Sequence, residues 1–126
     1  MSWANRVHAV TLVVDDLAAA REFYARVFDL PEHYSDDASV VFKVGDLLVN
    51  LLIRDAAFDL VAPAAVGAAT DGVRVQFTIP VEDVDAVAGQ LQDRGVELLR
   101  GPEDRPWGIR TATFQDPFGH TWELAQ

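Results

Sequence analysis

The sequence predicts an α+β fold built from two tandem β-α-β-β-β units within a single domain. Each half of the chain opens with a run rich in β-branched residues and continues with an apolar stripe of helical spacing. The two halves align when one is shifted by 67 residues. This shift matches the first strand, the helix cap and the helix start: Thr11 with Thr78, Asp16 with Asp83, and Leu17 with Val84. An ordered repeat of this kind indicates a duplicated structural unit.

The first unit is expected to begin with a strand over residues 7–14, "VHAVTLVV". Asp15 and Asp16 follow as candidate helix caps, because a short acidic side chain can accept hydrogen bonds from the first free N–H groups of a helix. The helix ends before Pro31, which cannot continue it. The remaining strands are expected at 39–44, at 46–54 beyond the Gly45-Asp46 turn, and around Leu60.

The second unit repeats this order. Residues 73–81 predict a strand, Asp83 a helix cap, and Gly95 the left-handed residue that follows a helix. The helix between them has an apolar stripe that contains Val84, Val87, Ala88 and Leu91. Three further strands are predicted at 96–99, 110–115 and 120–125.

Length and composition fit one folded domain. The chain has 126 residues, of which half are apolar, enough for one core and too few for two independent ones. The segment "FDLVAPAAVGAATDG" between the units is rich in small residues and predicts a mobile connector. We therefore expect a first module over about 4–60, a linker over about 61–72 and a second module over about 73–126.

The charge balance excludes some partners. Ten basic against twenty acidic residues give a net charge of −10, which disfavours nucleic acid and anionic membranes and would attract a cationic ligand. The alternative is that the charge only keeps the protein soluble. No cysteine, signal peptide or long apolar run is present in the sequence, so a soluble cytoplasmic protein is expected.

Two stretches make the chain resemble a known family. They are "VTLVVDDLAAAREFYARVFDL" at the first helix and "RPWGIRTATFQDPFGHTWELAQ" at the end, and the resemblance covers essentially the whole chain. The sequence is similar to the vicinal oxygen chelate superfamily, which includes glyoxalase I, extradiol dioxygenases and bleomycin-resistance proteins. The resemblance implies a rolled mixed sheet from each module, the two forming a cup that holds a small molecule, and a homodimer. It does not decide between catalysis and binding.

The resemblance also implies where a metal would be held. In metal-dependent members, His and Glu ligands lie on the first strand and on a last or near-last strand of each unit. Those positions fall here at Ala9, Asn50, Gln76 and Glu123, and only Glu123 matches. His8 is one residue out of register, and alternation along a strand would point it to the opposite face unless a β-bulge intervened.

The remaining donors fit a transition metal poorly. Asn and Gln oxygens with a single carboxylate suit calcium or magnesium better than zinc, nickel or iron, and one negative charge binds a divalent ion weakly. His33, in a polar stretch, and His120, after the last turn, are expected to be surface histidines. No cofactor is expected, although a divalent metal is left open.

Alternation separates a polar face from an apolar face in each predicted sheet. Gln76 and Glu123 lie on polar faces, whereas Trp122 and Leu124 face the helix side. Aromatic side chains could form the walls of a ligand site, with a core position favoured for Phe42 and a dimer contact equally open for Trp107. The candidate ligand-binding residues are Ala9, Phe42, Asn50, Phe58, Arg74, Gln76, Trp107 and Glu123.

Two classes of function remain. In the first, the chain binds an antibiotic-like or aromatic small molecule, which could be cationic, without metal and without chemistry. In the second, it is a lyase, isomerase or dioxygenase, with either a divergent metal site such as His8 with Glu123 or Glu123 acting as a general base. The missing histidines favour binding.

Overall fold

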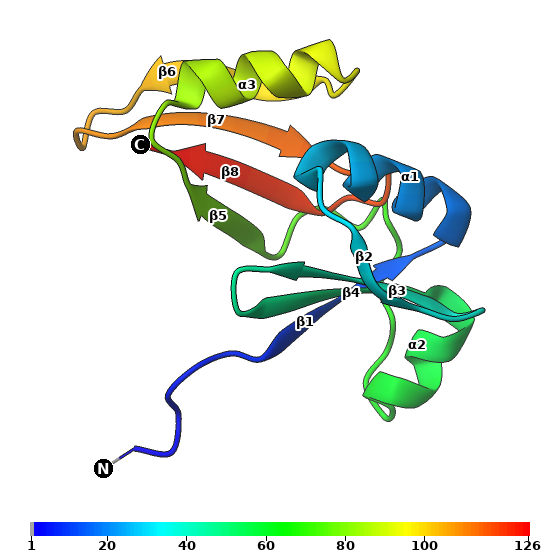
Figure 1. Cartoon of the computed structure of the whole chain (residues 1–126). Helices are drawn as coiled ribbons and strands as arrows, with labels where there is room; N and C mark the ends of the chain where they lie inside the picture. The colour runs from blue at the N-terminus through cyan, green and yellow to red at the C-terminus, as the bar shows by residue number, and fades with distance from the viewer. Residues whose placement is uncertain (1) are drawn as a thin grey trace. The chain divides into compact units, whose positions relative to one another are not determined.

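The computed structural model describes residues 2–126, and its contacts divide the chain into two compact units, Met1–Gly67 and Ala68–Gln126. The division falls inside the 61–72 segment. Each unit has its own four-stranded mixed sheet and its own packed helix (Figure 1). Among residues 2–126, none of the helices has the length and apolar character needed to span a bilayer.

The first unit forms a sheet in the strand order β1-β4-β3-β2. The outer strand β1 runs parallel to β4, and the other pairs are antiparallel. Its elements in chain order are β1 (Ala9–Val14), α1 (Leu17–Phe28), β2 (Glu32–Ser35), β3 (Ser39–Val44), β4 (Leu47–Ile53) and α2 (Arg54–Val61).

The second unit repeats this topology in the order β5-β8-β7-β6, with β5 parallel to β8. Its elements are β5 (Gln76–Pro80), α3 (Val84–Asp93), β6 (Leu98–Asp104), β7 (Arg110–Gln115) and β8 (Thr121–Ala125). The predicted tandem β-α-β-β-β fold is confirmed, although neither sheet is closed.

Both principal helices begin where the sequence predicts. The side chain of Asp16 accepts a hydrogen bond from the N–H of Ala19 (3.0 Å), and Asp83 accepts one from the N–H of Ala86 (3.1 Å). Each carboxylate satisfies a backbone donor that the helix itself leaves free. At the far end of α3, Gly95 has the predicted positive φ, 83°.

The core of each unit lies between the sheet and its helix. In the first unit, Phe42 of β3 is fully buried, and its ring meets that of Phe28 of α1 at 5.8 Å. In the second, Trp122 and Leu124 of β8 are 2% and 3% exposed, as alternation predicts. The rings of Trp122 and Phe114 are stacked at 6.4 Å.

The prediction of a strand around Leu60 is wrong, because those residues belong to α2. The missing strand is β2, within the stretch "PEHYSDD". All four of its residues are exposed. The strand therefore lacks the alternation of apolar and polar residues that predicts a half-buried strand from sequence. β2 is an edge strand that is held by backbone pairing to β3.

A buried carboxylate organises the turn between β7 and β8. The side chain of Asp116 is fully buried, and its Oδ1 accepts hydrogen bonds from the N–H groups of Phe118 (2.8 Å) and His120 (2.9 Å). Its Oδ2 lies 2.6 Å from Nδ1 of His120. The expectation that His120 is a surface histidine is therefore wrong, since its side chain is only 17% exposed and is tied into the turn.

Replacing Asp116 by Ala is expected to destabilise the protein by about 3 kcal/mol, because two backbone donors and one ring nitrogen lose their acceptor. Urea unfolding followed by tryptophan fluorescence measures the loss. Asp37→Ala is the matched control, since Asp37 is an exposed acidic residue. Equal stability of the two variants would contradict the role given to Asp116.

Candidate functional site

Each sheet has an apolar face toward its helix and a polar face on the opposite side. On the helix side of the first sheet, Val49 and Leu51 are fully buried, whereas Asn50 between them points the other way. The predicted separation of faces is therefore present in β4. The first polar face is mixed and comprises Ala9, Thr11, Val13, Ser39, Val41, Lys43, Leu48, Asn50 and Leu52; the second comprises Gln76, Thr78, Pro80, Thr111, Thr113, Gln115, Thr121, Glu123 and Ala125.

Asn50 of β4 lies between β1 and β3 on the first polar face. It lies opposite Thr11 across the parallel pair β1–β4, and its Nδ2 donates to the hydroxyl of Thr11 at 3.3 Å. Its Oδ1 is buried and has no hydrogen-bond partner within the described chain. Reversing the amide would exchange the two atoms and leave Nδ2 unpaired instead, so one polar atom lacks a partner in either orientation.

The second polar face has an equivalent pair. Thr78 lies opposite Glu123 across the parallel pair β5–β8, and its hydroxyl donates to Oε1 of Glu123 at 3.0 Å. Arg74, the cation that the sequence offers as a partner for this carboxylate, precedes β5 and is exposed. In the part of the chain that the structure describes, no ion pair joins Arg74 to Glu123.

The residues paired with Asn50 and Glu123 are not Ala9 and Gln76, which the family resemblance implied as their neighbours. Ala9 lies opposite Leu48, and Gln76 lies opposite Thr121, one step along the same faces. The cross-strand partners of the two central polar residues are therefore Thr11 and Thr78. The 67-residue repeat aligns these threonines with each other, and that alignment was the sequence signal for them.

These donors do not fit the metal that the family resemblance implies. The methyl group of Ala9 cannot coordinate, the amides of Asn50 and Gln76 carry no charge, and Glu123 already accepts a hydrogen bond at one oxygen. Residues 2–126 contain no group of three His, Cys, Asp or Glu side chains arranged to hold an ion. Within each unit, the amide and carboxylate groups are able to form hydrogen bonds.

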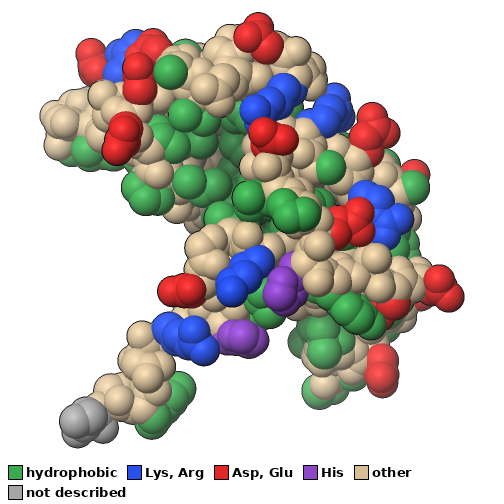
Figure 2. Space-filling model, viewed as in Figure 1, with side chains coloured by type: hydrophobic (Ala, Val, Ile, Leu, Met, Phe, Trp, Pro, Cys, Tyr) green, Lys and Arg blue, Asp and Glu red, His purple; other side chains and the backbone are tan. Residues whose placement is uncertain are grey.

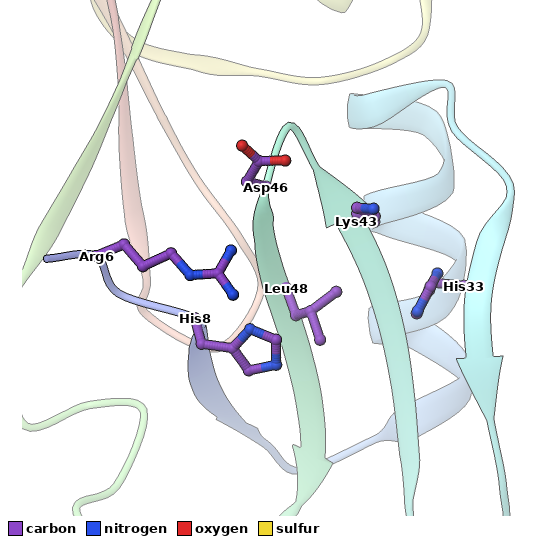
Figure 3. A pocket seen from close by; sticks show the side chains of 6 residues that line it. All are labelled: Arg6, His8, His33, Lys43, Asp46 and Leu48. Carbon is purple, nitrogen blue, oxygen red and sulfur yellow. The ribbon is translucent and has the colours of Figure 1, made fainter.

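A pocket of about 240 Å³ opens on the first unit. Its lining residues come from the segment before β1, from the β3–β4 turn and from three strands: Arg6, His8, His33, Lys43, Asp46 and Leu48 (Figure 3). Lys43 and Leu48 are paired across β3 and β4 and belong to the first polar face. In Figure 2, Lys or Arg and His side chains gather close together on one part of the surface.

The prediction that His8 points away from the polar face is wrong. His8 precedes β1, where regular strand alternation does not yet apply, and its ring extends toward Leu48 (Figure 3). Its backbone oxygen accepts a hydrogen bond from the N–H of Leu48 at 2.9 Å. This contact holds the segment before β1 beside β4.

His33 reaches the same pocket because of a β-bulge. Glu32 pairs with Phe42, but Tyr34 pairs with Val41, so two steps along β2 match one step along β3. A bulge of this kind redirects the side chains around it. Next to it, the hydroxyl of Tyr34 donates to Asp36 at 2.9 Å, and this bond raises the pKa of Tyr34 above its ordinary value.

The predicted aromatic walls have different environments. Phe42 is in the core, the position favoured from the sequence, and is not available to a ligand. Phe58 on α2 is 50% exposed, and Trp107 between β6 and β7 is 66% exposed with the Arg105 guanidinium 5.4 Å from its ring centre. A ligand contact for Phe58 or Trp107 stays a prediction.

Two relatives are similar to most of this chain. An uncharacterized protein of Mycobacterium tuberculosis H37Rv is 31% identical over 126 residues, covering 91% of this chain and 71% of the relative. An uncharacterized protein of Bacillus subtilis, YraH, is 31% identical over 114 residues, covering 86% of this chain and 88% of the relative. Neither relative indicates an activity for this chain, because both are uncharacterized.

Solved structures share the fold. A glyoxalase/bleomycin resistance protein/dioxygenase from Nocardioides superposes with a TM-score of 0.87 at 22% identity, covering 99% of this chain and 85% of that one. A lactoylglutathione lyase from Agrobacterium tumefaciens gives 0.76 at 24% identity, covering 95% and 92%. The model of the Glyoxalase/Bleomycin resistance protein/Dioxygenase superfamily matches residues 6–124, and the chain belongs to this family.

Proposed function

We propose that this chain is a small-molecule-binding protein that holds an antibiotic-like or aromatic ligand on its polar faces without metal and without chemistry. The observation that supports this most directly is the buried, unpaired atom of the Asn50 amide. A buried polar group without a partner costs about 1–3 kcal/mol. A ligand that supplies the complementary hydrogen-bonding group would remove this cost when it binds.

The surroundings of Asn50 suit an organic ligand. Leu48 lies two residues before it on the same face of β4 and lines the pocket, and Val41 lies directly opposite on β3. Apolar side chains beside a few fixed polar groups are typical of ligand sites. The volume of about 240 Å³ is small, so the pocket would hold one ring or one functional group of a larger molecule.

Glu123 supplies a second candidate contact. Thr78 donates to its Oε1, which leaves Oε2 to accept from a ligand donor or a cationic group. The net charge of −10 would favour the approach of a cation. This reasoning supports the proposal that the second polar face binds a cationic or hydrogen-bond-donating part of a ligand.

The enzyme alternative has less support. A metal-dependent lyase or dioxygenase needs ligands that the described donor set does not supply. A reaction with Glu123 as general base would need that carboxylate beside a substrate proton, and no contact in the described chain favours it.

We also propose a homodimer, by analogy with the family. Trp3 and Val7 in the segment before β1 are 92% and 67% exposed and are apolar side chains that a second copy of the chain would cover. Sedimentation equilibrium at micromolar concentration is expected to give twice the chain mass. A monomer throughout that range would refute this part of the proposal.

Purified protein is expected to contain much less than one transition-metal ion per chain, because the donor set lacks histidine and thiolate ligands. Elemental analysis by mass spectrometry measures the content. Incubation with EDTA is expected to leave the melting temperature unchanged. Stoichiometric zinc, nickel or iron, together with a fall in melting temperature on chelation, would contradict metal-free binding.

Asn50→Leu is expected to weaken ligand binding about ten-fold, the effect of one lost hydrogen bond, without lowering stability. Isothermal titration with a bleomycin-type glycopeptide and with neutral aromatic compounds measures the affinity. Gln90→Leu is the matched control, since it also removes an amide but lies exposed on α3.

Two further variants examine the other predicted contacts in the same titrations. Glu123→Gln is expected to lower the affinity for cationic ligands more than for neutral ones. Trp107→Ala is expected to lower the affinity for aromatic ligands. Glu22→Gln on the exposed side of α1 controls for the change of net charge. Absence of binding by every compound, or wild-type affinity in all three variants, would count against the proposed function.

A further inference from the structure

The pocket of the first unit brings together cations that have no protein partner. Three of the ten basic side chains have no hydrogen bond, ion pair or ring contact in the described chain: those of Arg6, Lys43 and Arg74. Two of these three, Arg6 and Lys43, line the same pocket. With twice as many acidic as basic residues in the chain, two unpaired cations beside one pocket need an explanation.

The lining groups form a row across the sheet. His8 is held beside Leu48 of β4 by the backbone hydrogen bond. Lys43 of β3 is paired with Leu48, and His33 lies at the bulge in β2, the next strand. Adjacent strands are about 4.8 Å apart, so three steps span about 14 Å. The row places an apolar side chain between nitrogen-bearing groups, a pattern suited to an apolar body with a charged end.

The balance of charge in the pocket is positive. Arg6 and Lys43 contribute two positive charges, and Asp46 in the β3–β4 turn contributes one negative charge. Neither cation forms an ion pair with Asp46 in the described chain. The guanidinium of Arg6 can donate two parallel hydrogen bonds to a carboxylate or phosphate, and Lys43 can add a point charge.

We infer that this pocket binds the anionic group, a carboxylate or a phosphate, of a small molecule whose apolar part lies on Leu48. The inference rests on the proposed small-molecule binding. The ligand group inferred for the first unit is anionic, whereas the net charge of −10 by itself would favour a cation. Arg6 and Lys43 bind the anion, His8 and His33 donate hydrogen bonds from the two ends of the row, and Leu48 contacts the apolar part.

A set of matched aromatic probes tests the ligand charge. Phenyl phosphate and benzoate carry the two anionic groups, benzamide is neutral, and benzylamine is cationic. Titration of the full chain, followed by amide chemical shifts in NMR spectra, reports both affinity and place. At least one anion is expected to shift the amides of Lys43 and Leu48 saturably and to bind about five-fold or more tightly than benzamide. Raising the salt concentration should weaken binding of the anionic probes more than binding of benzamide.

Charge variants identify the residues that are responsible. Arg6→Met with Lys43→Met is expected to lower the affinity for the anion about ten-fold. Asp46→Asn is expected to raise this affinity about two-fold to five-fold. Arg26→Met with Arg100→Met removes the same two positive charges at exposed sites outside the pocket and should leave affinity unchanged. Circular dichroism confirms that each variant remains folded.

The outcomes separate this inference from the proposed function. If benzamide or benzylamine binds at the pocket as tightly as both anions, the chain still binds small molecules, but the inferred ligand charge is wrong. Anion binding that the double methionine variant retains, or that Asp46→Asn does not change, also overturns the assignment. If no probe shifts the amides of the first unit, the pocket assignment falls, and the titrations of Asn50→Leu still decide the proposed function.

Discussion

The parallel pairing of the first and last strand in each unit determines where the polar side chains of this protein lie. Because side chains alternate along a strand, fixing the register of β1 on β4 fixes the face of every residue in both strands. The register brings Thr11 opposite Asn50 and Thr78 opposite Glu123. The same alternation packs Val49, Leu51, Trp122 and Leu124 into the two cores. The polar pairs and the cores are thus two results of one constraint.

Features that depend on local chemistry or on regular alternation could be predicted from the sequence. Asp16 and Asp83 cap helices because a short carboxylate just before a helix can accept a hydrogen bond from one of its first free N–H groups. The burial of Trp122 and the opposite direction of Asn50 follow from counting residues by two along a strand. Even the threonine partners were present in the sequence repeat, although their pairing with Asn50 and Glu123 requires the cross-strand register.

The rest of the site depends on irregular backbone, which alternation cannot describe. His33 enters the pocket because β2 contains a bulge, and β2 itself escapes detection because none of its residues is buried. His8 reaches the pocket from a segment outside β1, where its backbone still bonds to Leu48. Likewise, Asp116 appears in the sequence as part of a turn, whereas its burial and its contact with His120 emerge only from the folded hairpin.

Net charge and local charge act over different distances, which reconciles an acidic chain with a site for an anion. At physiological salt, exposed charges are largely screened beyond about 8 Å, so a bound group responds mainly to the side chains that surround it. The total of −10 acts on the approach of a ligand, whereas Arg6, Lys43 and Asp46 act on the bound state. For an anion the two effects oppose each other: the protein as a whole slows encounter, and the pocket slows release. Ligand charge in this protein therefore has to be inferred from the residues around each polar face, and the composition of the chain gives only the long-range field.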